Sequence, residues 1–314
     1  MTAVAPAPRV PGRPAFRLPR YLEVETSRLR EPGRGPLGGG AHSRTAPAQG
    51  RDPADIRREA AAGRQELMAW PLFDKIAREL GELGYAGWWG FHHCCEPLLN
   101  PRLVREVEHV RSLVPAARPA ILTSGDLLTP GLLVDLLQLG AGYVRITRYP
   151  RHPNEGPAYE PIRQWLVAGG LLESLPWRFV EMRHGWAAVY ERDGLRVDVI
   201  RPRLRATAGT ARVPGRDEPP HVCPTPHGPS GECVTSDPER ASIDCSGEMA
   251  TCRTVFADLP ACGRHTIGNL RERTFADLWS SPTMAAFHDP DAGTGWSPWP
   301  TEGICTERYP VVPA

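Results

Sequence analysis

Cysteines at an ordered spacing are the residues of this sequence with the clearest chemical potential. Cys233 is followed by thirteen residues, Gly247, four residues and then Cys252. The segment Thr-Ile-Gly-Asn-Leu comes next at 266–270, and Thr-Phe-Ala-Asp-Leu-Trp follows at 274–279. Thiolates bind iron and zinc, and paired thiols can instead form disulfides. The spacing therefore indicates a metal site or a disulfide unit in the last third of the chain.

Length and charge limit what the rest of the chain can be. The 314 residues can bury one large core, or one core plus a small cofactor-stabilised appendage. A net charge of +1 offers no electrostatic case for binding nucleic acid or an anionic membrane. Because no apolar run near the N-terminus suits a signal peptide or a spanning helix, we expect a cytoplasmic protein. In that compartment the eight cysteines bind metal more often than they form disulfides, which stay the alternative.

Hydrophobic periodicity predicts strands that alternate with helices. Strands are expected at 21–25, 87–91, 120–123, 143–147, 178–182 and 195–200, and helices at 72–83, 100–113, 129–139 and 161–167. This alternation is typical of a parallel α/β sheet or barrel. Residues 1–17 read as a disordered arm, 18–204 as the barrel and 215–314 as a second, loop-rich unit. Residues 28–66 interrupt the barrel with an irregular segment rich in Arg, Gly, Ala and Pro.

Three loops that follow predicted strands carry the next set of candidate residues, because functional residues of parallel barrels sit after the carboxyl ends of strands. These loops lie at 91–101, 121–129 and 144–147, and they resemble the segments after strands two, three and four of radical S-adenosylmethionine (SAM) enzymes. The resemblance implies that Glu96 lies beside the SAM ammonium group, Gly125 forms a tight turn over the barrel mouth, and Thr147 contacts the ribose. Cys94 and Cys95 stand where the family usually has glycines.

The cysteine-rich end resembles the SPASM or twitch module that follows many radical SAM barrels. That resemblance implies a partial (β/α)6 barrel with a small C-terminal SPASM/twitch-like domain, and a hairpin at 242–249 that turns at Gly247. It also implies one auxiliary [4Fe–4S] cluster, since full SPASM modules add further cysteines where this chain has only Cys305. The implied ligands are Cys233, Cys252 and Cys305, with Cys262 or Cys223 as the fourth. Cys245 is expected to be a packed thiol.

Two alternatives remain open for the histidines and cysteines. A zinc site could draw on some of His221, Cys223, His227, Cys252, Cys262 and His265, although no Cys-x-x-Cys pair is present. His92 and His93 are either functional groups at the barrel mouth or polar residues that end a strand.

The cluster loop that cleaves SAM in this family is missing. The family places Cys-x-x-x-Cys-x-x-Cys after its first strand, whereas this chain has no cysteine before Cys94. Two explanations stay open. The chain is a member that lost reductive SAM cleavage, or residues 28–66 come from a disrupted coding segment of a GC-rich gene.

The family resemblance implies a reaction and a set of partners. It points to hydrogen abstraction by a 5′-deoxyadenosyl radical from a peptide, aminocyclitol, sugar or nucleoside in a natural-product type pathway. SAM and a reductant protein would then be needed, and the substrate would be a small molecule or a peptide. The alternative is a non-catalytic accessory or binding protein that retains one iron–sulfur or zinc site.

Overall fold

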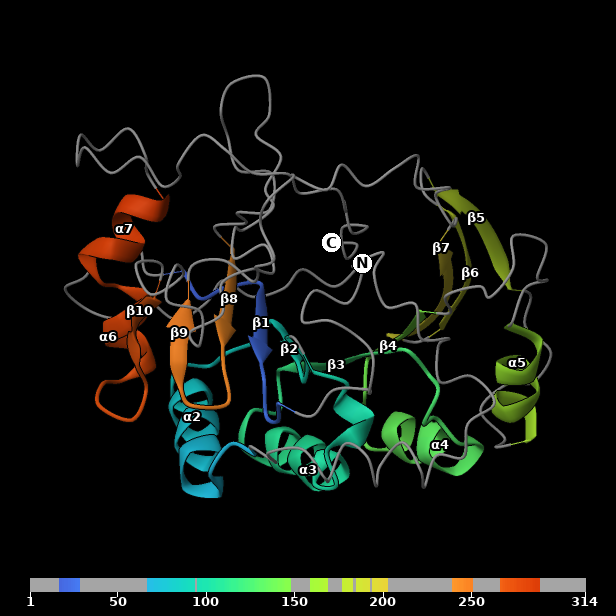
Figure 1. The fold of residues 1–314 in the computed structure, drawn as a ribbon, viewed down its shortest axis with the longest axis horizontal. Helices are drawn as coiled ribbons and strands as arrows, with labels where there is room; N and C mark the ends of the chain where they lie inside the picture. Colours follow the sequence, from blue (N-terminus) through green and yellow to red (C-terminus); the bar gives the residue numbers. More distant parts are fainter. Residues whose placement is uncertain are drawn as a thin grey trace, which may run out of the picture.

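A single mixed sheet organises the chain in this computed structural model (Figure 1). The structure describes residues 17–28, 67–93, 95–147, 159–168, 177–182, 185–192, 194–202, 239–250 and 266–288. Its described strands form one sheet in the order β10-β9-β8-β1-β2-β3-β4-β7-β6-β5. The expectation of an α/β fold is confirmed. No helix within the described ranges is long and apolar enough to cross a membrane.

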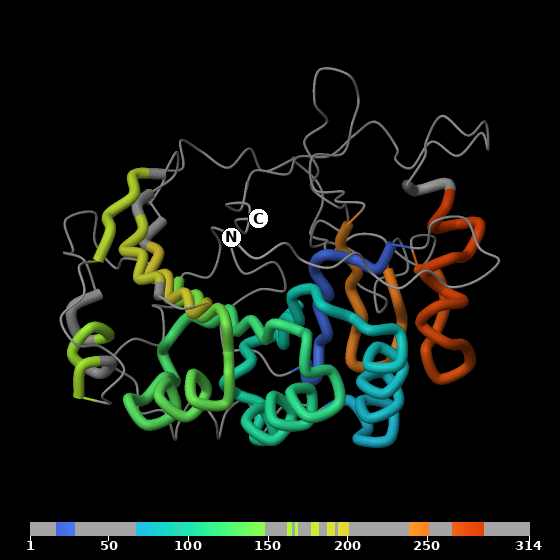
Figure 2. The backbone as a smooth tube through the Cα atoms, turned by 180° about the vertical axis from the view of Figure 1, so that it is seen from behind, coloured from blue at the N-terminus to red at the C-terminus, as the bar shows by residue number. Residues whose placement is uncertain are grey.

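The centre of the sheet is parallel and is covered by helices on one side. It consists of β1 (Tyr21–Val24), β2 (Trp88–Gly90), β3 (Arg118–Thr123) and β4 (Tyr143–Thr147). Helices α2 (Trp70–Glu82), α3 (Leu103–Leu113) and α4 (Pro130–Gln138) lie together on one face of these strands, as both views show (Figures 1 and 2). A short 3-10 helix, η1 (Pro97–Leu99), connects β2 to α3.

Local signals explain where these helices start and stop. The Thr129 hydroxyl accepts a hydrogen bond from the Leu132 amide at the start of α4, and Gly140 ends that helix with φ of +89°. The helix expected to begin at Asn100 begins at Leu103 instead. The side-chain oxygen of Asn100 accepts from the Arg102 amide in the turn before α3. The side-chain nitrogen of Asn100 donates to Thr26 Oγ1 and Glu106 Oε2, so the expected helix cap also makes buried tertiary contacts.

Alternation along the strands separates a core face from a polar face. Leu22, Val24, Val144 and Ile146 pack toward the helices in the main hydrophobic core. Their neighbours Tyr21, Ala120 and Tyr143 form a separate cluster, with Trp88 and Leu122 packed against it. We call this second surface, opposite the helices, the inner face of the sheet.

One edge of the sheet is antiparallel and contains a strand that the periodicity did not predict. Strand β7 (Leu195–Pro202) pairs in parallel with β4, whereas β6 (Gly185–Arg192) runs antiparallel between β7 and β5 (Arg178–Met182). Helix α5 (Tyr159–Ala168) precedes this edge. The Asp-Gly pair at 193–194, with Gly194 at φ of +82°, is the hairpin signal that could have revealed β6.

The other edge is built by the C-terminal part of the chain. Strand β8 (Arg240–Ile243) pairs in parallel with β1, and β9 (Glu248–Ala250) and β10 (Thr266–Asn269) follow in antiparallel order. Helices α6 (Phe275–Trp279) and α7 (Pro282–His288) complete this unit. The predicted domain boundaries near 204 and 215 lie outside the described residues, but the sheet itself is continuous across the two predicted parts.

Lys75 joins the helical layer to this C-terminal unit. It is the only lysine in the sequence. Its ammonium group donates to the carbonyls of Leu270, at 2.7 Å, and Arg273, at 2.9 Å, and lies 2.7 Å from Glu79 Oε1. Glu79 in turn accepts from the Phe275 amide at 2.8 Å. Three convergent acceptors suit a compact ammonium better than a planar guanidinium.

We therefore expect Lys75→Arg to weaken the contact between α2 and residues 270–275. The predicted loss is about 1–3 kcal/mol in the free energy of unfolding, because charge-assisted hydrogen bonds to two carbonyls would be distorted. Urea unfolding of the two proteins measures this difference. The matched control is Arg78→Ala, which removes an exposed partner of Asp74 on the same helix and should leave the free energy of unfolding almost unchanged. Equal losses for both variants would contradict the prediction.

Candidate functional site

Glu96 ties together the loops that follow β2 and β3. Its carboxylate accepts from the Thr123 hydroxyl at 2.6 Å, the Ser124 amide at 2.9 Å and the Leu98 amide at 3.1 Å. The last contact caps the 3-10 helix that starts at Pro97. These three hydrogen bonds hold the buried Glu96 carboxylate at the carboxyl ends of two neighbouring parallel strands.

The charge of Glu96 has no described counterpart. Burial raises the pKa of Glu96, and the hydrogen bonds from Thr123, Ser124 and Leu98 lower it less. Among the described residues no cation forms a salt bridge with this carboxylate. A nearby ammonium group would stabilise the ionised form of this buried carboxylate. It would lower the pKa of the carboxylate and compensate for the lost hydration. The site chemistry therefore fits an amino group such as that of SAM.

Gly125 lies beside Glu96, and Thr147 lies farther along the sheet. Gly125 has φ of +77°, a backbone conformation that favours glycine, and its amide donates to the Thr123 hydroxyl at 3.0 Å. The tight turn expected there is present. Thr147 ends β4, the strand next to β3, and pairs with Ile200 of β7. The structure thus brings Glu96 and Gly125 together and places Thr147 at the same edge, while their roles toward SAM stay predictions.

A second polar cluster lies on the inner face around Glu23, which the sequence analysis did not select. Register aligns Ser242, Glu23, Gly90, Ala120 and Tyr143 in one row across five strands. The buried Glu23 carboxylate accepts from Arg240 at 3.1 Å and from the Ser242 hydroxyl at 3.2 Å. It also contacts both histidines of the loop after β2: 3.3 Å from His93 Nδ1 and 3.6 Å from His92 Nε2.

These neighbours set the protonation of the cluster. Burial alone would raise the pKa of Glu23, but His92, His93 and the positive charge of Arg240 outweigh it and hold that pKa well below the usual range. Burial lowers the pKa of His92, although Glu23 opposes this effect. At neutral pH the cluster therefore contains an ionised carboxylate, an arginine cation and a neutral His92. His92 and His93 thus both contact Glu23, and a functional role for either stays a prediction.

The inner face carries a third group of buried polar residues beyond β3. Asp198 of β7 accepts from Arg196 at 2.8 and 2.9 Å and from the Tyr143 hydroxyl at 3.0 Å. Arg145 of β4 is also buried, and it is the register partner of Asp198. Charges of both signs on an otherwise apolar sheet surface suit a small molecule with several polar groups. Polar residues stand at every second position of β1, β4 and β7. This alternation is the sequence signal that could have revealed the inner face.

The segment after β1 does not fit the cluster that cleaves SAM in the family. The chain has no cysteine between β1 and Cys94, so no set of three thiolates exists there. The described part of this segment is built into the fold instead. The Thr26 carbonyl accepts from the Met68 amide, Thr26 Oγ1 accepts from Asn100, and Ser27 forms an isolated antiparallel bridge with Leu67. Ser27 and Leu67, which flank this segment, therefore lie side by side.

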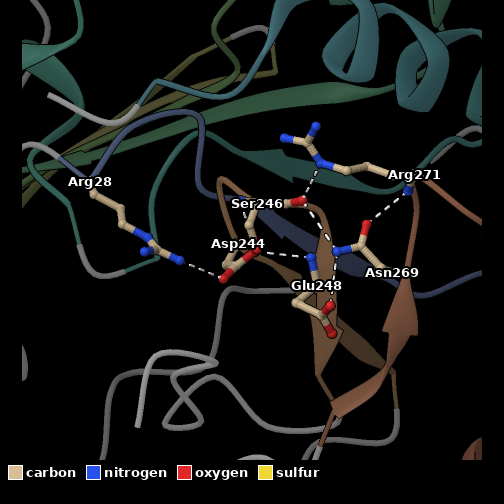
Figure 3. A network of polar contacts seen from close by, with 6 residues as sticks. All are labelled: Arg28, Asp244, Ser246, Glu248, Asn269 and Arg271. Atoms are coloured by element: carbon tan, nitrogen blue, oxygen red, sulfur yellow. Dashed lines mark hydrogen bonds and ion pairs between the residues drawn. The ribbon is translucent and has the colours of Figure 1, made fainter.

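The expected hairpin around Gly247 is present and is held by a polar network (Figure 3). Asp244 Oδ1 accepts from the amides of Ser246 and Glu248 and from the Ser246 hydroxyl, while Arg28 contacts Oδ2 at 3.0 Å. Gly247 has φ of +93°, and a Cβ there would lie 2.9 Å from Asn269 Oδ1 and 3.0 Å from Leu72 Cδ2. The turn therefore needs a glycine for both its conformation and its packing.

Asn269 connects this hairpin to β10. Its side-chain amide donates to the Ser246 carbonyl at 3.3 Å and to Glu248 Oε1 at 2.8 Å, and its Oδ1 accepts from the Arg271 amide at 2.8 Å. The Gly-Asn-Leu segment noted in the sequence therefore connects the hairpin to the following helix through hydrogen bonds. Cys245 is buried in the core, as expected for a packed thiol.

The proposed cluster ligands Cys233, Cys252, Cys262 and Cys305 lie outside the described residues, as does the rival set His221, Cys223, His227 and His265. In the part of the chain that the structure describes, no group of three His, Cys, Asp or Glu residues could hold a metal ion. The assignment of these ligands stays a prediction.

The depressed pKa of Glu23 predicts how stability responds to acid. A pKa lower in the folded than in the unfolded chain stabilises the fold above the ordinary glutamate pKa of about 4.3, and this contribution is lost as pH falls through the folded value. Glu23→Gln should therefore cost roughly 3 kcal/mol at pH 7, because Arg240 loses its buried partner. The gap between wild type and variant should narrow below about pH 5.

Urea unfolding at several pH values measures that gap. The control is Glu191→Gln, which removes an exposed partner of Arg178 and should cost less than about 1 kcal/mol. A gap for Glu23→Gln that stays constant between pH 7 and pH 4 would show that the ionised carboxylate is not what stabilises this cluster.

Comparison with known proteins bears on the family and the fold of the chain. Residues 233–306 match the SPASM family, described as an iron–sulfur cluster-binding domain. A 78-residue stretch, 25% of this chain, is 36% identical to the S-adenosyl-L-methionine-dependent 2-deoxy-scyllo-inosamine dehydrogenase of Niallia circulans. That stretch spans 31% of the relative, less than a third of its length.

The fold is also similar to a solved structure, the crystal structure of BtrN in complex with AdoMet and 2-DOIA. The TM-score is 0.52, with 18% identity over 87% of this chain and 86% of that chain. At this identity the likeness concerns the fold alone. The SPASM match begins at Cys233 and ends one residue after Cys305, so it contains all four predicted ligands. Together with the dehydrogenase match, it confirms the predicted resemblance to the radical SAM/SPASM family.

Proposed function

We propose that this chain binds SAM and a small molecule rich in hydroxyl and amino groups, of the aminocyclitol or sugar class, within a partial (β/α)6 barrel. The observation that carries the proposal is the buried Glu96 carboxylate, which no described cation pairs. The dehydrogenase relative supports the substrate class, since its name specifies both SAM dependence and an aminocyclitol. By the same resemblance the chain belongs to an oxidoreductase lineage of natural-product type pathways.

SAM would lie across the carboxyl ends of β2, β3 and β4. Glu96 would receive the ammonium group, with its carboxylate already oriented by three hydrogen bonds. The turn at Gly125 would allow close approach of the bound molecule, and Thr147 would offer its hydroxyl to the ribose. The inner face around Glu23, Arg145 and Asp198 would then hold the second molecule through charged and hydroxyl side chains.

The SPASM domain would hold one auxiliary [4Fe–4S] cluster. Cys233, Cys252 and Cys305 are the proposed ligands, and Cys262 is the proposed fourth. When bound, such a cluster supplies a one-electron acceptor or donor next to the barrel. The hairpin clasped by Asp244 and Asn269 would position the chain on either side of the ligands, since Cys252 follows β9 by two residues.

The segment after β1 favours a second candidate function, an accessory or binding protein without SAM cleavage. Three thiolates are required for the SAM-cleaving cluster, and residues 25–66 contain none. In this form the chain would retain ligand binding and the auxiliary cluster alone. Resequencing the gene across residues 28–66 separates this candidate from a disrupted coding segment, because an intact frame without cysteines leaves only the accessory protein.

The proposed compartment and partners rest on the charge and hydrophobicity of the sequence. We place the protein in the cytoplasm, with a small-molecule or peptide substrate, no nucleic-acid or membrane partner, and a reductant protein only if SAM is cleaved.

Glu96→Gln should weaken SAM binding by about 10–100-fold, the loss expected when a charge-assisted hydrogen bond of roughly 1.5–3 kcal/mol is removed. Wild-type affinity should rise with pH through the raised pKa of Glu96, because only the ionised carboxylate pairs with the ammonium group. Isothermal titration calorimetry at several pH values measures both effects. The control is Glu106→Gln, a buried carboxylate held by Asn100 and Arg102. If both variants bind SAM equally well, Glu96 is not the ammonium site.

Anaerobic reconstitution with iron and sulfide tests the cluster assignment. We expect about four irons per chain and no 5′-deoxyadenosine after addition of SAM and dithionite, because only the SPASM cysteines can ligate a cluster. Cys233→Ser and Cys252→Ser should each lose most of the iron, whereas Cys245→Ser should retain it. About eight irons with SAM cleavage would overturn the interpretation of residues 25–66. Zinc without iron would instead favour the zinc alternative.

A further inference from the structure

The inner face contains a buried acceptor that the described contacts leave unsatisfied, the Nδ1 atom of His92. His92 is 7% exposed, and its Nδ1 has no hydrogen-bond partner among the described residues. A buried polar atom without a partner costs about 1–3 kcal/mol, so such atoms are usually satisfied by a ligand or an ordered water. The hydrogen bonds of Glu96, in the same loop, do not involve this atom.

Gly90 explains why the imidazole can lie on the inner face. His92 follows β2, and a Cβ on Gly90 would lie 2.7 Å from His92 Cε1 and 3.1 Å from Nδ1. The same Cβ would lie 3.0 Å from the Tyr21 hydroxyl oxygen. The absence of a side chain at Gly90 therefore creates the space in which the His92 ring folds back over the sheet toward β1.

The charged groups that face His92 determine which ring nitrogen carries the proton. They are Glu23 on β1, Arg240 on β8 and the adjacent His93, and the neutral Tyr21 hydroxyl on β1 lies beside them. Nε2 lies 3.3 Å from the Tyr21 hydroxyl and 3.6 Å from Glu23 Oε1. A lone pair on Nε2 would face the ionised carboxylate and be repelled, whereas an N–H there is attracted. The tyrosine hydroxyl can accept or donate and so allows either arrangement.

We propose that Glu23 holds His92 as its Nε2–H tautomer, so that the unprotonated Nδ1 accepts a hydrogen bond from a hydroxyl or amino group of the molecule bound on the inner face. The identity of that molecule as an amino polyol rests on the proposed function. The tautomer itself rests only on the contacts of Glu23, Tyr21 and Gly90. Burial keeps the pKa of His92 low, so the ring remains a neutral acceptor at neutral pH.

Nitrogen NMR of the full-length chain tests the tautomer. With ¹⁵N-labelled histidine, the signals of His92 are assigned as those lost in His92→Gln, out of ten histidines. We expect an unprotonated Nδ1 and a protonated Nε2 in the free protein. Glu23→Gln should shift the ring toward a mixture of tautomers, while Tyr21→Phe should leave the Nε2–H form in place. A free protein with a proton on Nδ1 would overturn the proposal.

Titration with 2-deoxy-scyllo-inosamine, the compound in the relative's name, tests the ligand. Saturating compound should move the His92 Nδ1 signal toward the protonated range. Gly90→Ala, which displaces the ring, should weaken binding at least tenfold, whereas Gly131→Ala adds a Cβ that meets nothing within 4 Å and should have no effect. Absence of binding, or an unchanged Nδ1 signal at saturation, would show that Nδ1 contacts only solvent or protein.

The test of the His92 tautomer and its ligand can fail independently of the test of the proposed function. The NMR experiment involves neither iron nor SAM cleavage. A responsive His92 in a chain that does not bind SAM would leave the inner-face site standing alone. A chain that binds SAM with an unresponsive His92 would leave the proposed function intact and remove this inference.

Discussion

The pairing of β1 with β8 is the contact on which the rest of the described structure depends. It joins residues 219 positions apart, Glu23 with Ser242 among them. Closing a loop of this size is entropically costly, although the cost grows only slowly with loop length. Buried Leu22, Val24, Ala241 and Ile243 on one side of the pair offset that cost. The Glu23–Arg240 contact on the other side aligns the strands. The hairpin of β8 and β9 is therefore an extension of the sheet and shares its core.

The same strands supply both the core and the candidate site. Successive side chains of a strand point to opposite faces, so one row packs against α2, α3 and α4 while the next faces the inner side. This arrangement explains how a sheet with a continuous apolar core also carries Glu23, Arg145 and Asp198 in buried positions. Each of these charges must be paired or bound by a ligand, because burying an isolated charge is expensive. The pairs on the inner face thus constrain what can bind there.

The described residues that flank the cysteine-free segment after β1 are anchored to one another. The Thr26 carbonyl accepts from the Met68 amide, and Ser27 forms a bridge with Leu67. The sheet beside them forms in a chain whose sequence lacks the SAM-cleaving motif. Glu96 and Glu23, the proposed binding groups, belong to strands and loops outside this segment.

Much of the fold was predictable from the sequence because its determinants are local. The apolar stripe of α2, the cap at Thr129, the turn glycines Gly125, Gly140 and Gly247, and the alternation of strands with helices all follow from periodicity and backbone preference. The ordered cysteines indicated the SPASM match, and the loop with Glu96 indicated the edge of the sheet that we propose for SAM. Strand β6 was missed, although the Asp-Gly pair beside it is a local signal.

Only the tertiary structure decided the inner-face cluster. Nothing near Glu23 in the sequence shows that Arg240, Ser242 and His92 surround it, because those contacts arise from strand register over long separations. Gly90 looked like an ordinary strand residue until its missing Cβ proved to make room for His92. The sequence by itself determined the elements and the cysteine pattern, since these depend on neighbours along the chain. The tertiary structure decided which charges meet, since pairing brings residues together regardless of their distance in sequence.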